Sequence, residues 1–150
     1  MRRRQMHHRQ TPLVLVRAHW AVSVHKVKNM FKDVLEKIIE RTEGSLGALI
    51  MGIDGIAVER SLKQAGDEAN LDVAAAEFTS LVRNAQKAGN DTGLGRLREL
   101  VISLDDAILL VRLLGKDYFV VLAISPEGNL GRARFELRKA ELQIASEFAM

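Results

Sequence analysis

The side chains that most often carry catalysis or bind metals are confined to the beginning of this chain. All four histidines lie in the first 25 residues, and the sequence contains no cysteine. From Met30 onward the chain therefore lacks the commonest general base, the commonest nitrogen ligand for a metal and the thiol nucleophile. An enzyme built from this part would have to use lysine, arginine and carboxylates alone.

The remaining polar side chains form no concentrated constellation. Asp105 and Asp106 are adjacent in a predicted turn, where carboxylates are usually solvated, and no partner acid is indicated across a cleft. Ser45, Ser61 and Ser103 have no histidine nearby in the sequence to activate them. No spacing of acids matches a transition-metal site. The sequence thus predicts no catalytic residue, cofactor or metal, and it favours a binding module.

Two glycine-containing segments and a group of arginines invite comparison with phosphate-handling sites. Residues 93–95 lack the lysine of a phosphate-binding loop and precede a predicted strand, so we interpret them as a connector. Residues 128–131 open a predicted helix and could receive an anion, but we favour a tight turn with close packing. An arginine finger usually lies on a mobile loop. We therefore interpret Arg132, Arg134 and Arg138 as a solvated helix face.

Charge is unevenly distributed along the chain. Residues 1–29 hold seven of the 22 basic side chains and no acid, so residues 30–150 hold 15 basic and all 19 acidic side chains, a net charge of −4. The sequence pI near 9.4 therefore reflects the first 29 residues. A nucleic-acid footprint is a basic patch on a folded surface, so we predict no nucleic-acid partner.

The basic leader, residues 1–29, has the order of a signal peptide, with an apolar stretch at residues 12–24 after a basic start. Arg17 and His19 interrupt that stretch, and no small-x-small cleavage site follows. It is also too short and too charged to span a bilayer. We expect Met30 to be the natural start and the leader to be disordered or upstream sequence. A membrane-surface or targeting role for it is the alternative.

About 120 residues follow the leader, which is the size of one domain. Apolar spacing predicts helices over residues 30–43, 71–88 and from 130 to the end of the chain. Alternating or continuous apolar runs predict strands over residues 46–52, 56–62, 96–103, 107–114 and 118–124. Asp54 and Gly55 suit a two-residue hairpin turn, and Asn70 is a predicted N-cap. We predict an α+β fold, a five-stranded antiparallel sheet sandwiched by helices in the order αββαβββα.

The predicted middle helix, residues 71–88, has two distinct faces. Its apolar stripe consists of Leu71, Ala74, Ala75, Phe78, Leu81, Val82 and Ala85. The opposite face carries Val73, Ala76 and Ser80, which are small or apolar, before Arg83 and Lys87. Solvated faces usually carry long charged side chains, so this row indicates a contact surface. The alternative is that alanine is simply a good helix former, and the sequence does not decide between the two.

Residues 31–149 resemble the roadblock family, which comprises roadblock-type dynein light chains and MglB-like bacterial regulators of small Ras-like GTPases. The order and spacing of five features carry the resemblance. They are Gly-Ser-Leu-Gly-Ala at 44–48, Ile-Asp-Gly-Ile-Ala at 53–57, the alanine-rich helix at 71–88, Leu-Gly-Arg at 94–96, and Asn-Leu-Gly-Arg at 129–132.

The resemblance implies a fold similar to longin and profilin-like sandwiches, and dimers whose middle helices lie side by side while their third strands pair. The implied dimer interface contains Glu77, Asn84, Arg96, Leu97, Arg98, Glu99 and Val101. The resemblance also implies that a small Ras-like GTPase binds the paired middle helices. The implied partner-binding residues are Val73, Ala76, Ser80, Arg83 and Lys87. The family is thought to arrange the GTPase's own residues without donating catalytic ones.

We therefore expect a cytoplasmic, homodimeric, non-enzymatic regulator of a small Ras-like GTPase, without a cofactor or membrane insertion. The absence of cysteine is consistent with a cytoplasmic location. A dimeric structural adaptor and a small-ligand sensor are the alternatives. A regulator changes GTP turnover, an adaptor only binds, and a sensor needs a sizeable internal pocket.

We predict that the leader is dispensable, because it lies outside the periodic region. A chain that starts at Met30 should melt as cooperatively as the full chain and dimerise equally. Thermal melting followed by circular dichroism, with light scattering for mass, tests this. Loss of cooperative melting after truncation would show that the leader packs on the domain.

Overall fold

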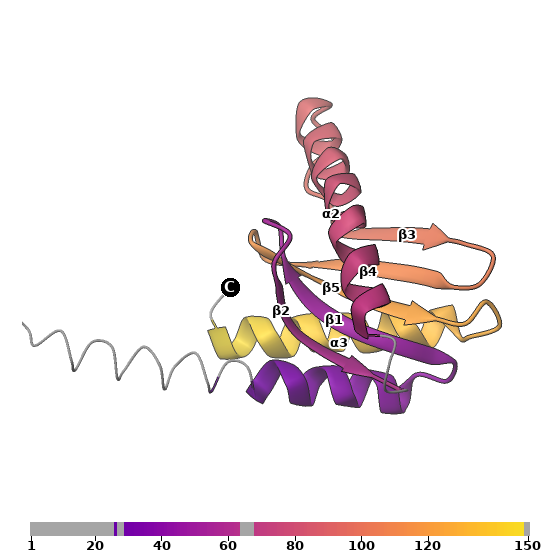
Figure 1. Ribbon diagram of the computed structural model, residues 1–150. Helices are drawn as coiled ribbons and strands as arrows, with labels where there is room; N and C mark the ends of the chain where they lie inside the picture. Colours follow the sequence, from indigo (N-terminus) through magenta and orange to yellow (C-terminus); the bar gives the residue numbers. More distant parts are fainter. Residues whose placement is uncertain (1–25, 27–28, 64–67, 149–150) are drawn as a thin grey trace, which may run out of the picture.

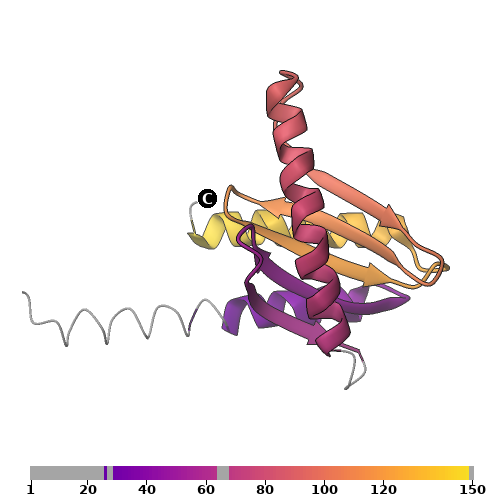
Figure 2. The same cartoon turned by 45° about the horizontal axis from the view of Figure 1, so that its top comes forward.

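The computed structural model of the chain describes residues 26, 29–63 and 68–148. Within them, a five-stranded sheet has one helix on one face and two helices on the other (Figures 1 and 2). This arrangement confirms the predicted α+β sandwich. The expectations for the leader lie outside the described residues, apart from residues 26 and 29.

The elements follow the predicted order. A first helix spans residues 29–41. The elements after it are β1 (Ser45–Gly52), β2 (Ala57–Leu62), α2 (Glu68–Asp91), β3 (Glu99–Ser103), β4 (Ile108–Leu114), β5 (Tyr118–Ile124) and α3 (Leu130–Phe148).

The sheet has the strand order β2-β1-β5-β4-β3, and every neighbouring pair is antiparallel. The central strands β1 and β5 are far apart in the sequence, and Ile50 lies opposite Val120 where they pair. The two described edges are β2 and β3. Both edge strands are more exposed than the three inner strands.

The core consists of two clusters separated by the sheet. Leu35 of the first helix, Ile50 of β1 and Leu137 of α3 belong to one cluster. Leu49 of β1 and Val82 of α2 belong to the other. Because successive side chains of a strand point to opposite faces, an inner strand covered on both sides is apolar at nearly every position. This explains the apolar runs of β1, β4 and β5, which Arg112 interrupts in β4.

The predicted boundaries of α2 are wrong at both ends. The helix begins at Glu68, before the predicted N-cap Asn70, and continues past Gly89 to Asp91. Gly89 does not end the helix. Its carbonyl accepts bonds from the amides of the returning loop, at 3.1 and 3.2 Å. A Cβ on Gly89 would collide with the main-chain carbonyl oxygen of Gly95. This glycine therefore permits the loop to return closely along the helix.

The predicted two-residue turn between β1 and β2 is also wrong, because residues 53–56 separate the two strands. The Ile56 amide donates to Oδ1 of Asp54 at 3.0 Å. Gly55 has a φ of +88°, which side chains rarely tolerate. Asp54 and Gly55 thus do shape the turn, but the carboxylate supports a longer loop.

We predict that Gly89→Ala lowers the free energy of unfolding by about 1–3 kcal/mol, because main chain must shift to admit the methyl group. Urea denaturation measures the change. Gly131→Ala is the matched control, since a Cβ there meets only Oδ1 of Asn129 at 3.5 Å. The control should leave stability equal or higher, because alanine is the better helix former. Equal stability of wild type and Gly89→Ala would contradict the close approach.

Candidate functional site

The outward face of α2, defined by Val73, Ala76 and Ser80, points away from the sheet as predicted. All three side chains are exposed, and Val73 retains 61% of its accessible surface. On the inward face, Ala75 and Val82 are buried. The helical phase deduced from the apolar spacing is therefore correct, and this face is open in the single chain.

One flank of the outward face is attached to the β1–β2 hairpin. Nε of Arg83 donates to the Ile53 carbonyl at 2.6 Å. Nearer the start of α2, Asp72 forms an ion pair with Arg60 of β2. Arg83 is thus held at the edge of the predicted partner-binding surface, whereas Lys87 is exposed further along the helix.

The other flank of α2 carries Glu77, Leu81 and Asn84, which are all exposed. The prediction that Leu81 is a core residue is wrong, because 45% of its surface is accessible. At 100° per residue Leu81 lies about 60° from Phe78, at the margin of the apolar stripe. The C-terminal part of α2 also extends beyond the sheet (Figures 1 and 2), so less of the sheet lies beneath it.

The position of Leu81 in the sequence already indicates its exposure. Leu81 and Val82 are neighbours, and residues 100° apart on a helix cannot both point directly at one sheet. Val82 is fully buried, so Leu81 is turned outward. The exposed leucine lies on the flank that holds Glu77 and Asn84, two residues of the predicted dimer interface.

The edge strand β3 is shorter than predicted, because it begins at Glu99 and not at residue 96. Leu100 and Ile102 pack on the α2-side core, whereas Val101 is exposed. Leu97 also packs on that core, although strict alternation from Leu100 and Ile102 would place it on the other face of the strand. It can do so because β3 begins only at Glu99, and the chain before the strand need not alternate. The alternation predicted over residues 96–103 therefore fails before the strand starts.

The predicted dimer-interface residues gather along one side of the molecule. Arg96 and Arg98 are exposed just before β3, and Leu97 is half-buried between them. Glu99 accepts from Nε of Arg134 at 2.9 Å, so its carboxylate points towards α3. Glu77 and Asn84 belong to α2, on the opposite face of the sheet. The predicted interface thus combines the open edge of β3 with the flank of α2.

Ser45 has a structural role, whereas Ser103, Asp105 and Asp106 face solvent. Ser45 is buried and its Oγ donates to the Ile39 carbonyl at 2.8 Å. Asp105 and Asp106 are exposed in the β3–β4 turn. In the described part of the chain, no group of three or more histidine, cysteine, aspartate or glutamate side chains could hold a metal ion.

The start of α3 is a closely packed turn, as favoured from the sequence. Oδ1 of Asn129 accepts from the Arg132 amide at 2.9 Å and caps the helix. A Cβ on Gly128 would lie 3.0 Å from the Ser125 carbonyl oxygen, so the glycine suits this close packing.

Among the described helices, none combines the length and the apolar character that a membrane span requires.

Comparison with known families identifies this fold. The family model of the Roadblock/LC7 domain matches residues 31–124, which is more than half of the chain. The chain belongs to the Roadblock/LC7 family. No curated protein sequence matches it.

Solved structures of roadblock proteins agree with this assignment. MglC from Myxococcus xanthus is 30% identical, with a TM-score of 0.61, and the alignment covers 79% of this chain and 99% of MglC. The gliding protein MglB from Thermus thermophilus is 22% identical, with a TM-score of 0.70 and coverage of 80% and 91%. MglB from Myxococcus xanthus is 12% identical, with a TM-score of 0.72 and coverage of 81% and 89%. The two MglB structures share the fold of this roadblock chain.

Proposed function

We propose that this roadblock domain forms a cytoplasmic homodimer, binds a small Ras-like GTPase on the outward faces of its α2 helices and alters nucleotide turnover. The observation that carries the proposal is the exposed row of small side chains on α2. Membership of the roadblock family supports it, since the sequence resembles the family's regulators of such GTPases.

The homodimer is supported by two exposed features on one side of the chain. Among the described strands, β3 pairs only with β4, so its outer main-chain groups are open to another strand. Such an edge favours association with a second chain. Leu81 exposes apolar surface on the flank of α2, which a second α2 lying alongside would cover.

The partner-binding surface is supported by the shape of the outward face. Ala76 and Ser80 leave little side-chain bulk between α2 and a docked protein, so main chains can approach closely. The hydroxyl of Ser80 donates to the Glu77 carbonyl at 3.2 Å within the helix, which keeps it close to the helix surface. A shallow face of this kind fits a broad partner surface better than a small molecule.

We propose that the domain acts by arranging the GTPase's own residues. Arg83 is the charged side chain nearest in sequence to the small row on its C-terminal side, and its Nε is bonded to the Ile53 carbonyl. That bond anchors the guanidinium against the β1–β2 hairpin, whereas an arginine finger usually lies on a mobile loop. Docking that orders catalytic loops of the GTPase requires no such finger.

We predict that the chain is a dimer and that Leu81→Glu weakens it. Light scattering at micromolar concentration should give about twice the chain mass of 16.7 kDa. A carboxylate introduced where two α2 helices meet would be desolvated without a partner. The variant should therefore shift the population towards the monomer.

Leu104→Glu is the matched control for the dimer experiment. Leu104 has a similar exposed fraction, 48%, but lies in the β3–β4 turn. This variant should keep the wild-type mass. A monomeric wild type would overturn the dimer. If Leu81→Glu keeps the dimer mass, as Leu104→Glu should, Leu81 is excluded from the interface.

We predict that Ala76→Arg abolishes GTPase binding but spares the fold and the dimer. Ala76 is exposed, and surface substitutions usually change stability by less than about 0.5 kcal/mol. Against a docked protein, the arginine would impose a steric clash and an unpaired buried charge. The binding partner for this test is the GTPase captured by the wild-type chain from native cells and identified by mass spectrometry.

Gln143→Arg provides the control for Ala76→Arg, since it adds the same charge on an exposed position of α3. Affinity, melting temperature, dimer mass and GTP turnover are measured for both variants. Unfolding of Ala76→Arg would contradict its outward placement, and unchanged binding would locate the docking surface elsewhere. If wild type binds the GTPase without altering turnover, the protein is an adaptor.

A further inference from the structure

A groove lies between β3, β4 and α3, on the side of the sheet opposite α2. Its volume is about 850 Å³. Five of its lining residues are basic, and they are Arg98, Arg112, Arg134, Arg138 and Lys139. The described domain is acidic in balance from residue 30 onward, so this basic groove runs against its overall charge.

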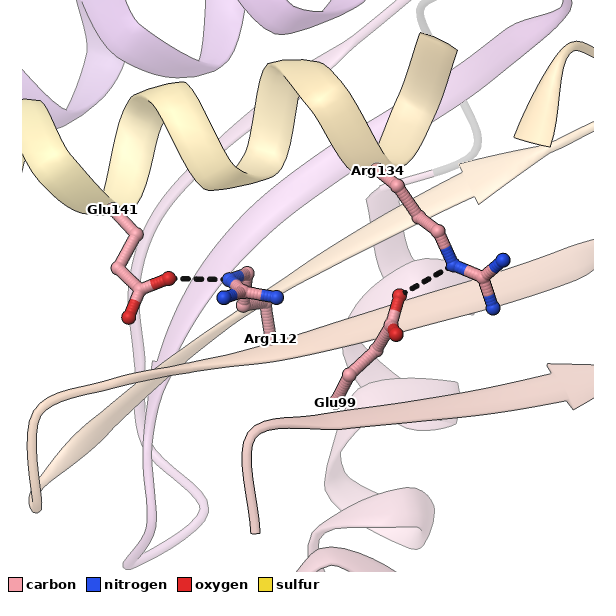
Figure 3. Close-up of polar contacts among 4 residues, drawn as sticks. All are labelled: Glu99, Arg112, Arg134 and Glu141. Carbon is pink, nitrogen blue, oxygen red and sulfur yellow. Dashed lines mark hydrogen bonds and ion pairs between the residues drawn. The ribbon is translucent and has the colours of Figure 1, made fainter. Parts of the chain in front are cut away.

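Two ion pairs join α3 to the strands at the groove. Figure 3 shows Arg134 of α3 reaching Glu99 of β3, and Glu141 of α3 reaching Arg112 of β4. These pairs tie α3 across the two strands. They also neutralise Arg112 and Arg134.

Three basic side chains of the groove remain without an acidic partner among the described residues, and they are Arg98, Arg138 and Lys139. Arg138 and Lys139 are neighbours on α3, and both side chains are exposed. An acidic ligand would supply the opposite charge that these two side chains lack.

The groove also contains apolar surface that the chain itself leaves open. Phe135 and Leu142 line it and retain 55% and 72% of their accessible surface. They lie seven residues apart, so they share one side of α3 about two turns apart. A ligand that covers them must supply apolar groups as well as negative charge.

Gly131 lines the same groove at the start of α3 and has no steric role within the chain. A Cβ there would make only an ordinary contact, 3.5 Å from Oδ1 of Asn129. Glycine is a poor helix former, so alanine would suit the helix better. The missing side chain does, however, widen the groove at one end.

We propose that this groove binds an acidic, amphipathic peptide segment of a partner protein. Carboxylates of the segment pair with Arg138 and Lys139, while its apolar side chains cover Phe135 and Leu142. From Gly131 to Leu142 the helix rises about 16 Å, which matches about five extended residues or three helical turns of a ligand. The surface is separate from the GTPase-binding face proposed on α2.

The other anionic macromolecules fit the groove less well. A nucleic acid presents a continuous row of phosphates, which would meet the carboxylates of Glu99 and Glu141 between the basic groups. A membrane surface is flat and would leave the hollow between β3 and α3 unfilled. A peptide can place acids and apolar side chains at alternating positions and so satisfy both kinds of surface.

Fluorescence anisotropy with a labelled peptide tests the proposal on the full chain. The probe has about twelve residues, in which pairs of glutamates alternate with leucines, to span the groove. We expect saturable binding that weakens as salt is added. The same peptide with glutamine in place of glutamate should not bind.

The combined variant Arg138→Glu and Lys139→Glu should lower peptide affinity at least about tenfold. The matched control is Lys32→Glu with Lys37→Glu, which makes the same charge change at exposed positions of the first helix. Gly131→Leu keeps the charge and should also weaken binding by filling the groove. Melting curves verify that each variant is folded.

Failure of the glutamate peptide to saturate, or equal binding by the groove variants and the control, would overturn the proposal. Tighter binding of a single-stranded oligonucleotide or of phosphatidylserine vesicles, with displacement of the peptide, would also overturn it. The α2 proposal is tested separately, because Ala76→Arg should retain peptide binding. The Arg138 and Lys139 variant should likewise retain the GTPase.

Discussion

The pairing of β1 with β5 is the constraint on which the rest of the structure depends. These strands come from opposite halves of the chain and form the centre of the sheet. Both are buried on their two faces, so the fold requires a helical layer on each side. The first helix and α3 cover one face, while α2 alone covers the other. Because α2 has no neighbouring helix on its face of the sheet in the described part of the chain, its outward face and its flanks stay exposed in the single chain.

The two sides of the molecule consequently present different chemistry. On α2, burial of Ala75 and Val82 turns Val73, Ala76 and Ser80 outward, and these short side chains make a nearly uncharged surface. Beneath β3, the ion pairs of Arg112 and Arg134 position α3 so that further basic side chains border a groove. Strand pairing through β3 uses main-chain groups in the plane of the sheet, and the α3 residues that border the groove lie outside the predicted dimer interface.

The spacing of apolar residues predicted strands and helix faces correctly wherever burial of apolar side chains was the main requirement. The apolar runs of β1, β4 and β5 predicted buried strands because any polar side chain there would be desolvated. Helical spacing placed Ala76 outward for the same reason, since its opposite face had to bury apolar groups. The pattern misled at margins. A glycine is common just after the end of a helix. Gly89 instead lies within α2, where its missing side chain lets residues 94 and 95 pack against the helix. Local spacing does not reveal this contact.

The sequence by itself determined the element order, the α+β class, the outward row on α2 and the resemblance to roadblock proteins. Each follows from periodicity or from motifs along the chain. Only the tertiary structure decided that Arg98, Arg112 and Arg138 border one groove. The crossing of α3 over β3 and β4 brings these side chains together (Figures 1 and 3). This depends on how distant segments pack, which is set by the whole core rather than by local sequence.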